Sequence, residues 1–574
     1  MTQSGLTEHE TAEAGPWNPG IQSTIPSRLL PLSTVFRADN VETSYDDALE
    51  LADFSGLKPV QTVAFRFERL LVHELLVRVT ADLSVPDGPE YEELGLNLRG
   101  MTARIRQAYV APVEDQLAAQ HAALVERAER YIEAELLAAN GPLTLEAAPS
   151  TDKGGLFSRL FANLTTGPAE KPARVQSRED HLAARRSRWA GASDPFHTAC
   201  GQALDFAVDA VLRTRGRLPA DTAAIARLAI NRFINTHCSE QIGLSLDPIV
   251  AEAAAQEGYK VLPAQSKPIV MNVKGASASG KSTLRPYQRE LADKLDVPWE
   301  SFALISPDYW RKYLLEYGSL GDDARYGAML TGHELEIIDK KLDRYMAYKA
   351  QRGDMPHLLI DRFRFDSFLS GATDGSDATG SNLLTRFGHT IFMFFMVTPP
   401  AETVERAWRR GLTTGRFKAV DDLLNHNVEA YTGMPGLFFA WALSDKKVHY
   451  EFLGNDVREG ERPRTIASGW NRRMRVFDVE GLLDIERFRR IDIEARDPAA
   501  VFSDGPIEMD EQSRFLARCC ERLDQVQIAD TNFDVETLPA EILQSASFAK
   551  RTAPEPDADF PDYRIGASGP ARAQ

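Results

Sequence analysis

One nine-residue segment constrains the fold more than any other part of the chain. It fits the pattern G-x-x-x-x-G-K-[ST] at every fixed position and reads Gly275-Ala276-Ser277-Ala278-Ser279-Gly280-Lys281-Ser282-Thr283. The apolar run 269–273 precedes it, and a helical pattern extends from it to about Leu295. A strand, a glycine-rich turn and a helix therefore follow one another, which predicts an α/β unit with the turn at the carboxyl end of a strand.

The loop pattern is typical of a phosphate-binding site, the P-loop (residues 275–283). Glycines let successive backbone N–H groups point into one concavity, and the N-terminus of the following helix adds the positive end of its dipole. In such a loop the Lys281 side chain reaches the β- and γ-phosphates, and the Ser282 hydroxyl ligates Mg²⁺. We expect the P-loop to bind ATP or GTP with Mg²⁺; the alternative is a Gly- and Ser-rich turn that binds nothing.

Short apolar runs alternate with helical stretches from the P-loop region onward. They span residues 268–273, 302–305, 357–360, 390–397 and 447–452. Strands separated by helices imply a parallel sheet covered on both faces. The predicted fold class is therefore α/β: a P-loop NTPase-type parallel sheet with helices on both faces, preceded by a largely α-helical N-terminal region.

The remaining domains are predicted from composition and periodicity. At roughly 150 residues per domain, the 574 residues leave room for three or four domains. Apolar residues three and four apart indicate helices, whereas segments rich in Pro, Gly, Ser or Asp indicate linkers and disorder. The predicted order is a disordered leader (1–40), a helical N-terminal domain (41–148), a linker (149–195), a helical segment (196–264), the P-loop kinase domain (265–480), a helical C-terminal segment (481–550) and a disordered tail (551–574).

The charge balance limits the partners that this chain can have. A total of 66 Lys and Arg against 83 Asp and Glu gives a net charge of −17, so the whole chain repels nucleic acid and anionic membranes. The longest apolar run, 391–397, is far shorter than the ~20 residues of a membrane helix, and the N-terminus has no signal-peptide pattern. We expect a cytoplasmic protein whose four cysteines, which lack CxxC spacing, are reduced thiols.

Acidic residues follow two of the predicted strands. Asp308 comes after 302–305, where a carboxylate can accept the proton of an acceptor hydroxyl and orient it towards the γ-phosphate. Its alternative role is to cap the helix that begins at Tyr309. Asp361 and Arg362 come after 357–360; Asp361 can hold a magnesium-bound water, and a cap at the strand end is the alternative.

A basic segment after the fourth predicted strand has the features of a lid. It spans residues 402–419 and contains Arg406, Arg409, Arg410, Arg416 and Lys418. Phosphoryl transfer spreads negative charge over the equatorial oxygens, and guanidinium groups on a closing segment stabilise that charge and exclude water. Gly411 and Gly415 supply the flexibility that closing needs. The alternative is a solvated basic face of a helix.

In this order, the motifs resemble the zeta toxin group of P-loop kinases over residues 268–456. The match rests on the P-loop, on Asp308 with Arg311 in Pro-Asp-Tyr-Trp-Arg, on Glu334 before the Asp361 strand, and on Arg409-Arg410 followed by Gly415-Arg416. That group folds as a parallel sheet with helices on both faces. The resemblance implies phosphorylation of a small hydroxylated acceptor, typically a UDP-linked amino sugar, with ATP or GTP as the donor.

The resemblance also assigns expected roles to individual residues. It implies catalytic roles for Lys281, Asp308, Arg410 and Arg416, and the candidate substrate contacts are Arg311, Glu334, Asp361 and Arg362. One departure concerns the acceptor: where the group presents a small residue or Thr after the third strand, this chain has Asp361-Arg362-Phe363-Arg364-Phe365-Asp366.

Three functions compete on the sequence. The first is a small-molecule kinase, favoured by the arginines beside a glycine hinge. The second is a nucleotide-switched regulatory or assembly ATPase, in which the helical N-terminal half binds a protein partner; the size of that half favours it. The third, phosphorylation of nucleic-acid ends, needs a basic funnel, and only the basic run 171–188 supports it.

Overall fold

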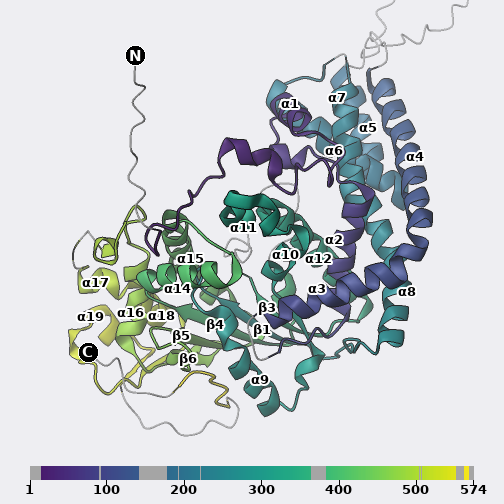
Figure 1. The fold of residues 1–574 in the computed structure, drawn as a ribbon. Coiled ribbons are helices and arrows are strands. Elements are labelled where there is room, and N and C mark those ends of the chain that lie inside the picture. The colour runs from purple at the N-terminus through teal and green to yellow at the C-terminus, as the bar shows by residue number, and fades with distance from the viewer. Residues whose placement is uncertain are drawn as a thin grey trace, which may run out of the picture. The chain divides into compact units, whose positions relative to one another are not determined.

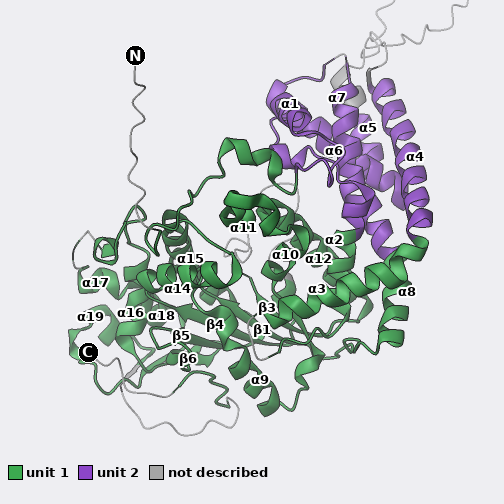
Figure 2. Cartoon of the chain, viewed as in Figure 1, with its two compact units in different colours: residues 1–35, 72–113, 245–574 green, residues 36–71, 114–244 purple. Residues whose placement is uncertain are grey.

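The computed structural model describes residues 14–88, 92–140, 178–191, 193–219, 221–362, 383–502, 505, 507–550 and 561–567. The chain divides into two compact units (Figure 2). Unit 1 comprises Met1–Val35, Val72–Val113 and Ser245–Gln574, and unit 2 comprises Phe36–Leu71 and Glu114–Leu244. Residues 41–148, expected to form one helical domain, therefore contribute to both units.

Unit 2 is helical. Its helices are α1 (Tyr45–Ser55), α4 (Glu114–Asn140), α5 (Arg178–Ala190), α6 (Pro195–Arg215) and α7 (Ala223–Phe233). Two of them begin at side chains that accept backbone N–H groups: Ser44 caps α1 through Asp47 N, and Asp194 caps α6 through His197 N. The apolar faces of α6 and α7 are buried, so these helices are held by the amphipathic pattern that the sequence predicts.

The sequence predictions for unit 2 are confirmed in part. The helix expected over 112–139 is α4. The stretch 149–195, expected to be a linker, contains α5, and Trp189 of that helix is buried. Residues 149–177, with the first seven residues of the basic run 171–188, lie outside the described residues, and the rest of that run belongs to α5.

Unit 1 contains one sheet of nine strands among the residues described (Figure 1). The spatial order is β2-β3-β1-β4-β5-β6-β7-β8-β9. The strands are β1 (Ile269–Lys274), β2 (Phe302–Ile305), β3 (His357–Asp361), β4 (Thr390–Val397), β5 (Lys447–Gly454), β6 (Arg464–Trp470), β7 (Arg473–Val476), β8 (Gln525–Ile528) and β9 (Phe548–Lys550).

The first five strands are parallel and match the five apolar runs of the sequence. In β4, Phe392, Phe394 and Met396 pack with the helix that follows the P-loop, whereas Ile391, Met393, Phe395 and Val397 pack with the α15 and α16 side. Successive side chains of a strand point to opposite faces, so an unbroken apolar run is what a strand covered on both faces requires.

The expected all-parallel sheet is wrong for the second half of the sheet. β6 pairs antiparallel with β5 and β7, and β8 and β9 extend the same sheet in parallel. The fold class is therefore α/β with a mixed sheet. Residues 481–550 are not only helical, because β8 and β9 lie there and Val526 and Ile528 belong to the sheet core.

The helices of unit 1 come from the segment 72–113 and from the long segment that begins at Ser245. They are α3 (Glu93–Ile105), α8 (Ser239–Glu257), α9 (Arg285–Lys294), α10 (Arg311–Leu314), α11 (Gly327–Leu330), α12 (Gly332–Arg352), α13 (Leu383–Arg386), α14 (Pro400–Thr414), α15 (Val420–Ala442), α16 (Val479–Phe488), α17 (Met509–Gln512), α18 (Arg514–Arg522) and α19 (Ala540–Leu543). Helix α2 (Phe67–Asp82) begins in unit 2 and continues into unit 1. Helix α8 does the same, because its residues up to Leu244 belong to unit 2 and those from Ser245 onward belong to unit 1.

The two terminal segments correct the expectation of disorder. In the leader, residues 27–32 form a 3₁₀ helix, and Leu29 packs with Leu315, Tyr317 and Leu330. In the tail, Ile565 is buried in the sheet core. Residues 1–13, 551–560 and 568–574 lie outside the described residues.

Two further expectations concern the membrane and the cysteines. No helix in the described ranges combines the length and the apolar character that crossing a membrane requires. Cys200, Cys238, Cys519 and Cys520 are free thiols and buried, as the sequence predicts.

Candidate active site

The P-loop lies at the carboxyl end of β1, the middle one of the five parallel strands. From β1 the chain crosses β3 to reach β2, whereas from β4 it passes to β5 on the other side. The two connections leave in opposite directions, and such a divergence opens a crevice at the carboxyl ends of parallel strands. The sequence order and the sheet topology thus bring the loop to the edge where α/β folds bind ligands.

Backbone geometry explains the glycines of the loop. Gly280 has φ +89°, and a Cβ there would lie 2.3 Å from Asn455 Nδ2. A Cβ on Gly275 would lie 2.6 Å from Ser279 Oγ and 2.7 Å from Met396 Cβ. Ala278 also has a positive φ of 60°. The loop is therefore a tight turn whose backbone approaches its neighbours too closely for side chains at these two positions.

Two residues that sequence reasoning missed hold the loop in place. The Ser279 carbonyl accepts hydrogen bonds from Thr398 Oγ1 at 3.0 Å and from Asn455 Nδ2 at 2.7 Å. Arg406 in turn donates to the Asn455 carbonyl at 2.8 Å. Thr398 follows β4 and Asn455 follows β5, so a polar residue directly after a buried strand is the signal that could have identified them.

The Lys281 side chain folds back over the loop. Its Nζ donates to the carbonyls of Gly275 at 3.2 Å and Ala276 at 2.8 Å. Burial lowers the pKa of Lys281, and the carboxylates of Asp361 and Asp308 oppose that shift. The ammonium is thus held beside the loop, between two acidic groups.

The loop fits a polyphosphate by two observations. Ser279 Oγ is buried and has no hydrogen-bond partner among the residues described, and the loop backbone is too closely packed for added Cβ atoms at Gly275 and Gly280. The hydroxyl of Thr283 is used internally, since it donates to the Gly280 carbonyl at 2.7 Å. Ser277 and Ser282 are half-buried on the same turn.

Asp308 lies between two arginines. Arg311 Nε is 2.8 Å from one carboxylate oxygen, and Arg416 Nη2 is 2.6 Å from the other. Burial alone would raise the pKa of Asp308, but Arg416 and Arg311 together hold it well below its usual range. The cap that the sequence offered as an alternative is absent, because the short helix Pro307–Trp310 has Ser306 at its N-cap and no side-chain cap.

The predicted lid supplies two cations to this place. Helix α14 ends at Gly415, which has φ +74° and turns the chain so that Arg416 reaches Asp308. Arg410, on the last turns of α14, influences the pKa values of both Lys281 and Asp308. Arg409 points elsewhere, since it pairs with Glu459 and its side chain is half-exposed. We call Lys281, Asp308, Arg311, Arg410 and Arg416 the loop-rim cluster.

Arg311 is occupied by the protein itself. Besides Asp308, its guanidinium donates to the Ala328 carbonyl at 2.6 Å and to Thr331 Oγ1 at 2.9 Å. It therefore fastens Asp308 to the segment before α12, and its expected direct contact with the substrate gains no support from this geometry.

Asp361 and Arg362 separate at the end of β3. Asp361 pairs in register with Val273 of β1, and its charge acts on Lys281. The Arg362 guanidinium instead binds Asp339 and Asp343 of α12, both at 2.7 Å. The prediction that Arg362 contacts the substrate does not fit the structure, because two carboxylates inside the protein already hold this cation.

Glu334 is also engaged inside the protein. Its carboxylate is fully buried and is 2.6 Å from Nε2 of His73, which is fully buried too. The prediction that Glu334 contacts the acceptor therefore does not fit the structure. Sequence reasoning could not foresee the pairing, since His73 lies on α2, far away in the chain.

A second polar cluster, which the sequence did not predict, is formed by Lys418, Asp422 and His426. Lys418 lies 3.1 Å from Asp422 Oδ2 and also contacts His426, so α15 and the segment before it share one polar cluster. Burial lowers the pKa of Lys418 to about 8. The pKa of His426 is lowered by burial, then by Lys418 and Lys281, against the opposing field of Asp308, so this imidazole is neutral at pH 7.

The donor set suits magnesium better than a transition metal. No cluster of three or more His, Cys, Asp or Glu side chains with metal-binding geometry occurs in the part of the chain that the structure describes. Mg²⁺ is bound through one or two protein oxygens together with substrate phosphates. Ser282 and Asp361 provide such oxygens beside the P-loop.

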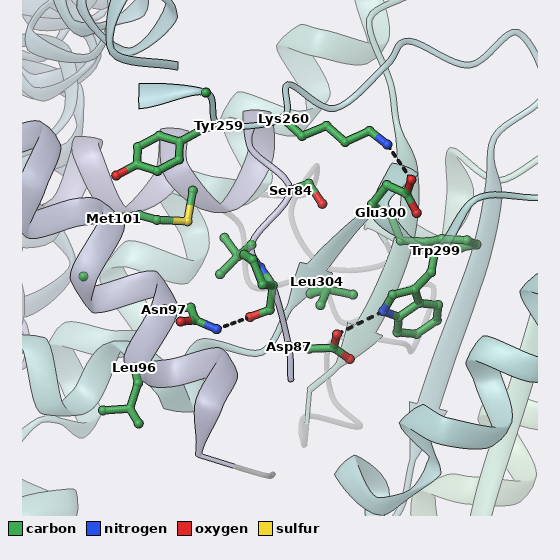
Figure 3. Close-up of a pocket in the computed structure, with 15 residues that line it drawn as sticks. Ser84, Asp87, Leu96, Asn97, Met101, Tyr259, Lys260, Trp299, Glu300 and Leu304 are labelled. Atoms are coloured by element: carbon green, nitrogen blue, oxygen red, sulfur yellow. Dashed lines mark hydrogen bonds and ion pairs between the residues drawn. The ribbon is translucent and has the colours of Figure 1, made fainter. Parts of the chain in front are cut away.

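One cavity of about 610 Å³ lies elsewhere in unit 1 (Figure 3). Its lining is largely apolar and includes Met101, Trp299 and Leu304. The charged groups there are already paired: Lys260 Nζ is 2.5 Å from Glu300, and Asp87 accepts from Trp299 Nε1 at 3.2 Å. It contains no glycine-rich loop, so it is no rival for the phosphate site.

Comparison with known proteins identified no similar protein. No protein-family model matches the chain, and no curated protein and no solved structure is similar to it.

Proposed function

We propose that this chain is a P-loop phosphotransferase that moves the γ-phosphate of ATP or GTP to a hydroxyl of a small acceptor. One observation carries the proposal: Lys281, Asp308 and the lid arginines Arg410 and Arg416, from three separate parts of the sequence, share one charged cluster beside a glycine-rich loop at the carboxyl end of β1. Transfer of a phosphoryl group needs positioning and positive charge more than covalent chemistry.

The fold supports a P-loop NTPase of the kinase type. The parallel half of the sheet, with β1 at its centre and the loop at the point of divergent connections, is the part that a nucleotide site uses. The sequence resemblance of residues 268–456 to the zeta toxin group points to the same function. The antiparallel strands β6 and β7 follow after this region.

Lys281 and the loop amides bind the phosphates. When a nucleotide is bound, the Lys281 ammonium exchanges the carbonyls of Gly275 and Ala276 for phosphate oxygens, while the positive end of the following helix faces the same oxygens. Thr398 and Asn455 hold the turn rigid, because both donate to the Ser279 carbonyl. A rigid loop loses little entropy on binding.

Asp308 orients the acceptor hydroxyl. With a pKa held low by Arg416 and Arg311, this carboxylate stays ionised but is a weak base. In a largely dissociative phosphoryl-transfer transition state, the bond to the leaving oxygen breaks early. The acceptor hydroxyl therefore does not need a strong base before that bond breaks. When Arg416 turns from Asp308 towards the transferring phosphate, the pKa of Asp308 rises, and the carboxylate can then take the hydroxyl proton.

Arg410 and Arg416 stabilise the charge that develops on the equatorial oxygens. Arg416 is only 9% exposed, so the site excludes water around the guanidinium and strengthens its interaction. Ser282 and Asp361 would hold Mg²⁺, which would supply further positive charge beside the phosphates.

The acceptor class follows from the resemblance, which implies a UDP-linked amino sugar. Glu334 and Arg362 are engaged inside the protein, so they do not select it. His426, whose pKa responds to the charges of Lys281 and Asp308, is the replacement candidate for an acceptor contact.

The test is transfer of labelled γ-phosphate. Purified full-length protein is incubated with γ-labelled ATP or GTP, Mg²⁺ and a pool of sugar nucleotides, and the products are separated. We expect label in an acceptor, and loss of that label with Lys281→Ala. Release of inorganic phosphate alone, unaffected by any acceptor, would contradict the kinase proposal.

One observation favours the second candidate, a nucleotide-switched regulatory ATPase. Thr80 of α2 accepts a hydrogen bond from Trp310 Nε1 at 3.2 Å, two residues from Asp308. The helical residues 72–113 are therefore in direct contact with the segment that carries Asp308. This candidate predicts slow hydrolysis independent of acceptor, and a protein partner whose binding changes with nucleotide.

A further inference from the structure

Unit 1 contains a cavity that the proposed phosphotransferase does not use (Figure 3). Its volume is about 610 Å³, and sites that enclose small organic molecules have volumes of this order. The lining residues come from the segments 84–87, 96–101, 258–260 and 299–304, all of which belong to unit 1. We call this space the α3 cavity. None of its lining residues belongs to the loop-rim cluster.

The walls of the α3 cavity are largely apolar. In Figure 3, Leu96 and Met101 of α3 lie on one side of the cavity, the Trp299 ring lies on the other, and Leu304 of β2 lies between them. Met101 is only 7% exposed, whereas Leu96 is 57% exposed although it is a large apolar residue. A ligand in the cavity would release water from this apolar surface, which favours the binding of an apolar molecule.

The charged side chains of the lining already have partners of opposite charge. Lys260 Nζ lies 2.5 Å from Glu300. Asp87 accepts from Trp299 Nε1 at 3.2 Å and pairs with Arg289 of α9 at 2.7 Å. A charged ligand would therefore lose hydration in an apolar cavity without gaining an unpaired counter-charge. The lining thus favours a neutral ligand over an ionic one.

One polar side chain of the lining is left to orient a ligand. The Ser84 hydroxyl has no hydrogen-bond partner in the part of the chain that the structure describes, and it lies near the middle of the cavity in Figure 3. Asn97, by contrast, donates to the Pro86 carbonyl at 2.9 Å. Since a hydroxyl both donates and accepts, Ser84 can bind an N–H, an O–H or an acceptor atom of a ligand.

We propose that the α3 cavity is a second small-molecule site, separate from the P-loop, that binds a neutral aromatic molecule carrying a hydrogen-bonding group for Ser84. The apolar walls select flat rings, the paired charges select against ionic groups, and the hydroxyl fixes the orientation. The inference goes beyond the proposed phosphotransferase, because no nucleotide contact enters it.

The α3 cavity adjoins two elements of the candidate active site. Leu304 lies on β2, which ends shortly before Asp308. Arg289, the partner of Asp87, lies on α9, the helix that follows the P-loop. The two sites are therefore close in the fold but share no residue, so we expect the occupancy of one not to exclude the other.

The experiment is a fluorescence titration of the full-length protein with phenylnaphthylamine. This probe is a neutral aromatic amine whose emission rises in apolar surroundings, and anilinonaphthalene sulfonate has the same rings with an added negative charge. We expect saturable binding of the neutral probe, at least about tenfold tighter than binding of the sulfonate. Absence of saturable binding, or equal affinity for the two probes, overturns the proposal.

Two substitutions test whether the probe occupies the α3 cavity. Gly100→Phe adds a ring at a lining position of α3 where a Cβ meets nothing within 4 Å, and it should weaken binding by roughly tenfold or more. Leu96→Gln, at an exposed position that folding tolerates, should weaken it by roughly threefold or more. The matched control is Leu137→Gln, at a leucine of α4 that is 74% exposed, and it should bind as the wild type does.

Probe binding that survives both cavity substitutions, or that falls equally in Leu137→Gln, contradicts the assignment to the α3 cavity. Competition with the nucleotide separates this site from the P-loop. Neither Mg·ATP nor Mg·GTP should displace the probe, and Lys281→Ala should bind the probe with wild-type affinity. Displacement by nucleotide would place the probe at the P-loop and overturn the second site. A chain that binds the probe but transfers no phosphate would contradict the phosphotransferase alone.

Discussion

Unit 1 contains two polar clusters that differ in how much of their charge is left for a ligand. In the loop-rim cluster, the Asp308 side chain is 44% exposed and lies beside a glycine-rich turn. The second cluster, the buried network of His73, Glu74, Arg78, Glu334 and Lys341, has side chains at most 6% exposed that bind one another. Both clusters are charged, but only the loop-rim cluster lies beside a glycine-rich turn, so it is the candidate site of the two.

The buried network shows what the helical N-terminal segment contributes to unit 1. His73 Nδ1 is 3.1 Å from Lys341 Nζ, and Arg78 pairs with Glu74 and, at 3.0 Å, with Asp247. These contacts join α2 to α12 and α8. Removing one partner of a buried ion-pair network leaves another charge buried without compensation, which is strongly destabilising. We therefore expect substitutions in this network to lower stability, and substitutions at the loop rim to lower activity.

The largest expected effect is a loss of phosphoryl transfer on substitution of Asp308 in the loop-rim cluster. Asp308→Asn should lower phosphoryl transfer by roughly 10²–10⁴-fold, because the hydroxyl is no longer oriented or deprotonated. The unfolding free energy should change by less than about 1 kcal/mol, since the carboxylate is partly exposed. Transfer assays and urea unfolding measure the two quantities.

The control for Asp308 is Asp445→Asn, at an exposed position after α15, where neither quantity should change. Wild-type transfer by Asp308→Asn would remove Asp308 from the mechanism and leave the loop as a binding site only.

The next effect falls on stability. Glu334→Ala leaves His73 buried without its carboxylate and removes one of the two carboxylates that act on buried Lys341, and it should lower the unfolding free energy by about 3–5 kcal/mol. Lys340→Ala, at an exposed position of the same helix α12, should change it by less than about 0.5 kcal/mol. If Glu334→Ala keeps wild-type stability but raises the KM for an acceptor, Glu334 belongs to the site after all.

A smaller effect is expected where the loop is held. Asn455→Ala removes the 2.7 Å hydrogen bond to the Ser279 carbonyl, and nucleotide affinity should fall by roughly three- to tenfold. Asn425→Ala, at a half-buried position of α15 where the side chain donates only to Glu429 among the hydrogen bonds of the described residues, is the control. Fluorescence titration with a labelled nucleotide measures both, and equal affinities for Asn455→Ala and the wild type would show that the loop keeps its shape without this contact.

The smallest effect is a pH dependence of stability. Burial lowers the pKa of Lys341 from 10.5 to about 8, so between these values the unfolded chain binds more protons than the folded one. The unfolding free energy contributed by Lys341 therefore rises as the pH increases from about 8 to 10.5. Lys341→Met should remove that rise relative to the wild type, and Lys340→Ala should keep it.

The sequence predicted the parallel half of the sheet because each of its strands carries a continuous apolar signal. β4 is buried along nearly its whole length on both faces. The strands β6 and β7 were missed because Arg464–Trp470 and Arg473–Val476 mix charged and small residues. Their place is set by pairing with β5 and with each other, which a local pattern does not contain.

Site residues could be predicted where a local sequence pattern, such as a strand end or a glycine, marks them. The P-loop, Asp308 and the arginines of the lid each follow a strand or a glycine, and the structure brings them together. Glu334 and Arg362 could not be placed, because their partners His73, Asp339 and Asp343 lie on helices whose packing the sequence does not reveal. A helix position predicts which residues are polar, but not which of them are paired.

The most direct measurement is calorimetric titration of Mg·ATP and Mg·GTP into the wild type, Lys281→Ala and Lys340→Ala. The account predicts that the wild type and Lys340→Ala bind one of these nucleotides with the same Kd, and that Lys281→Ala binds it roughly 100-fold more weakly, because the charged donor to the phosphates is lost. Equal binding by Lys281→Ala, or no binding of either nucleotide by the wild type, would contradict the assignment of the P-loop as the nucleotide site.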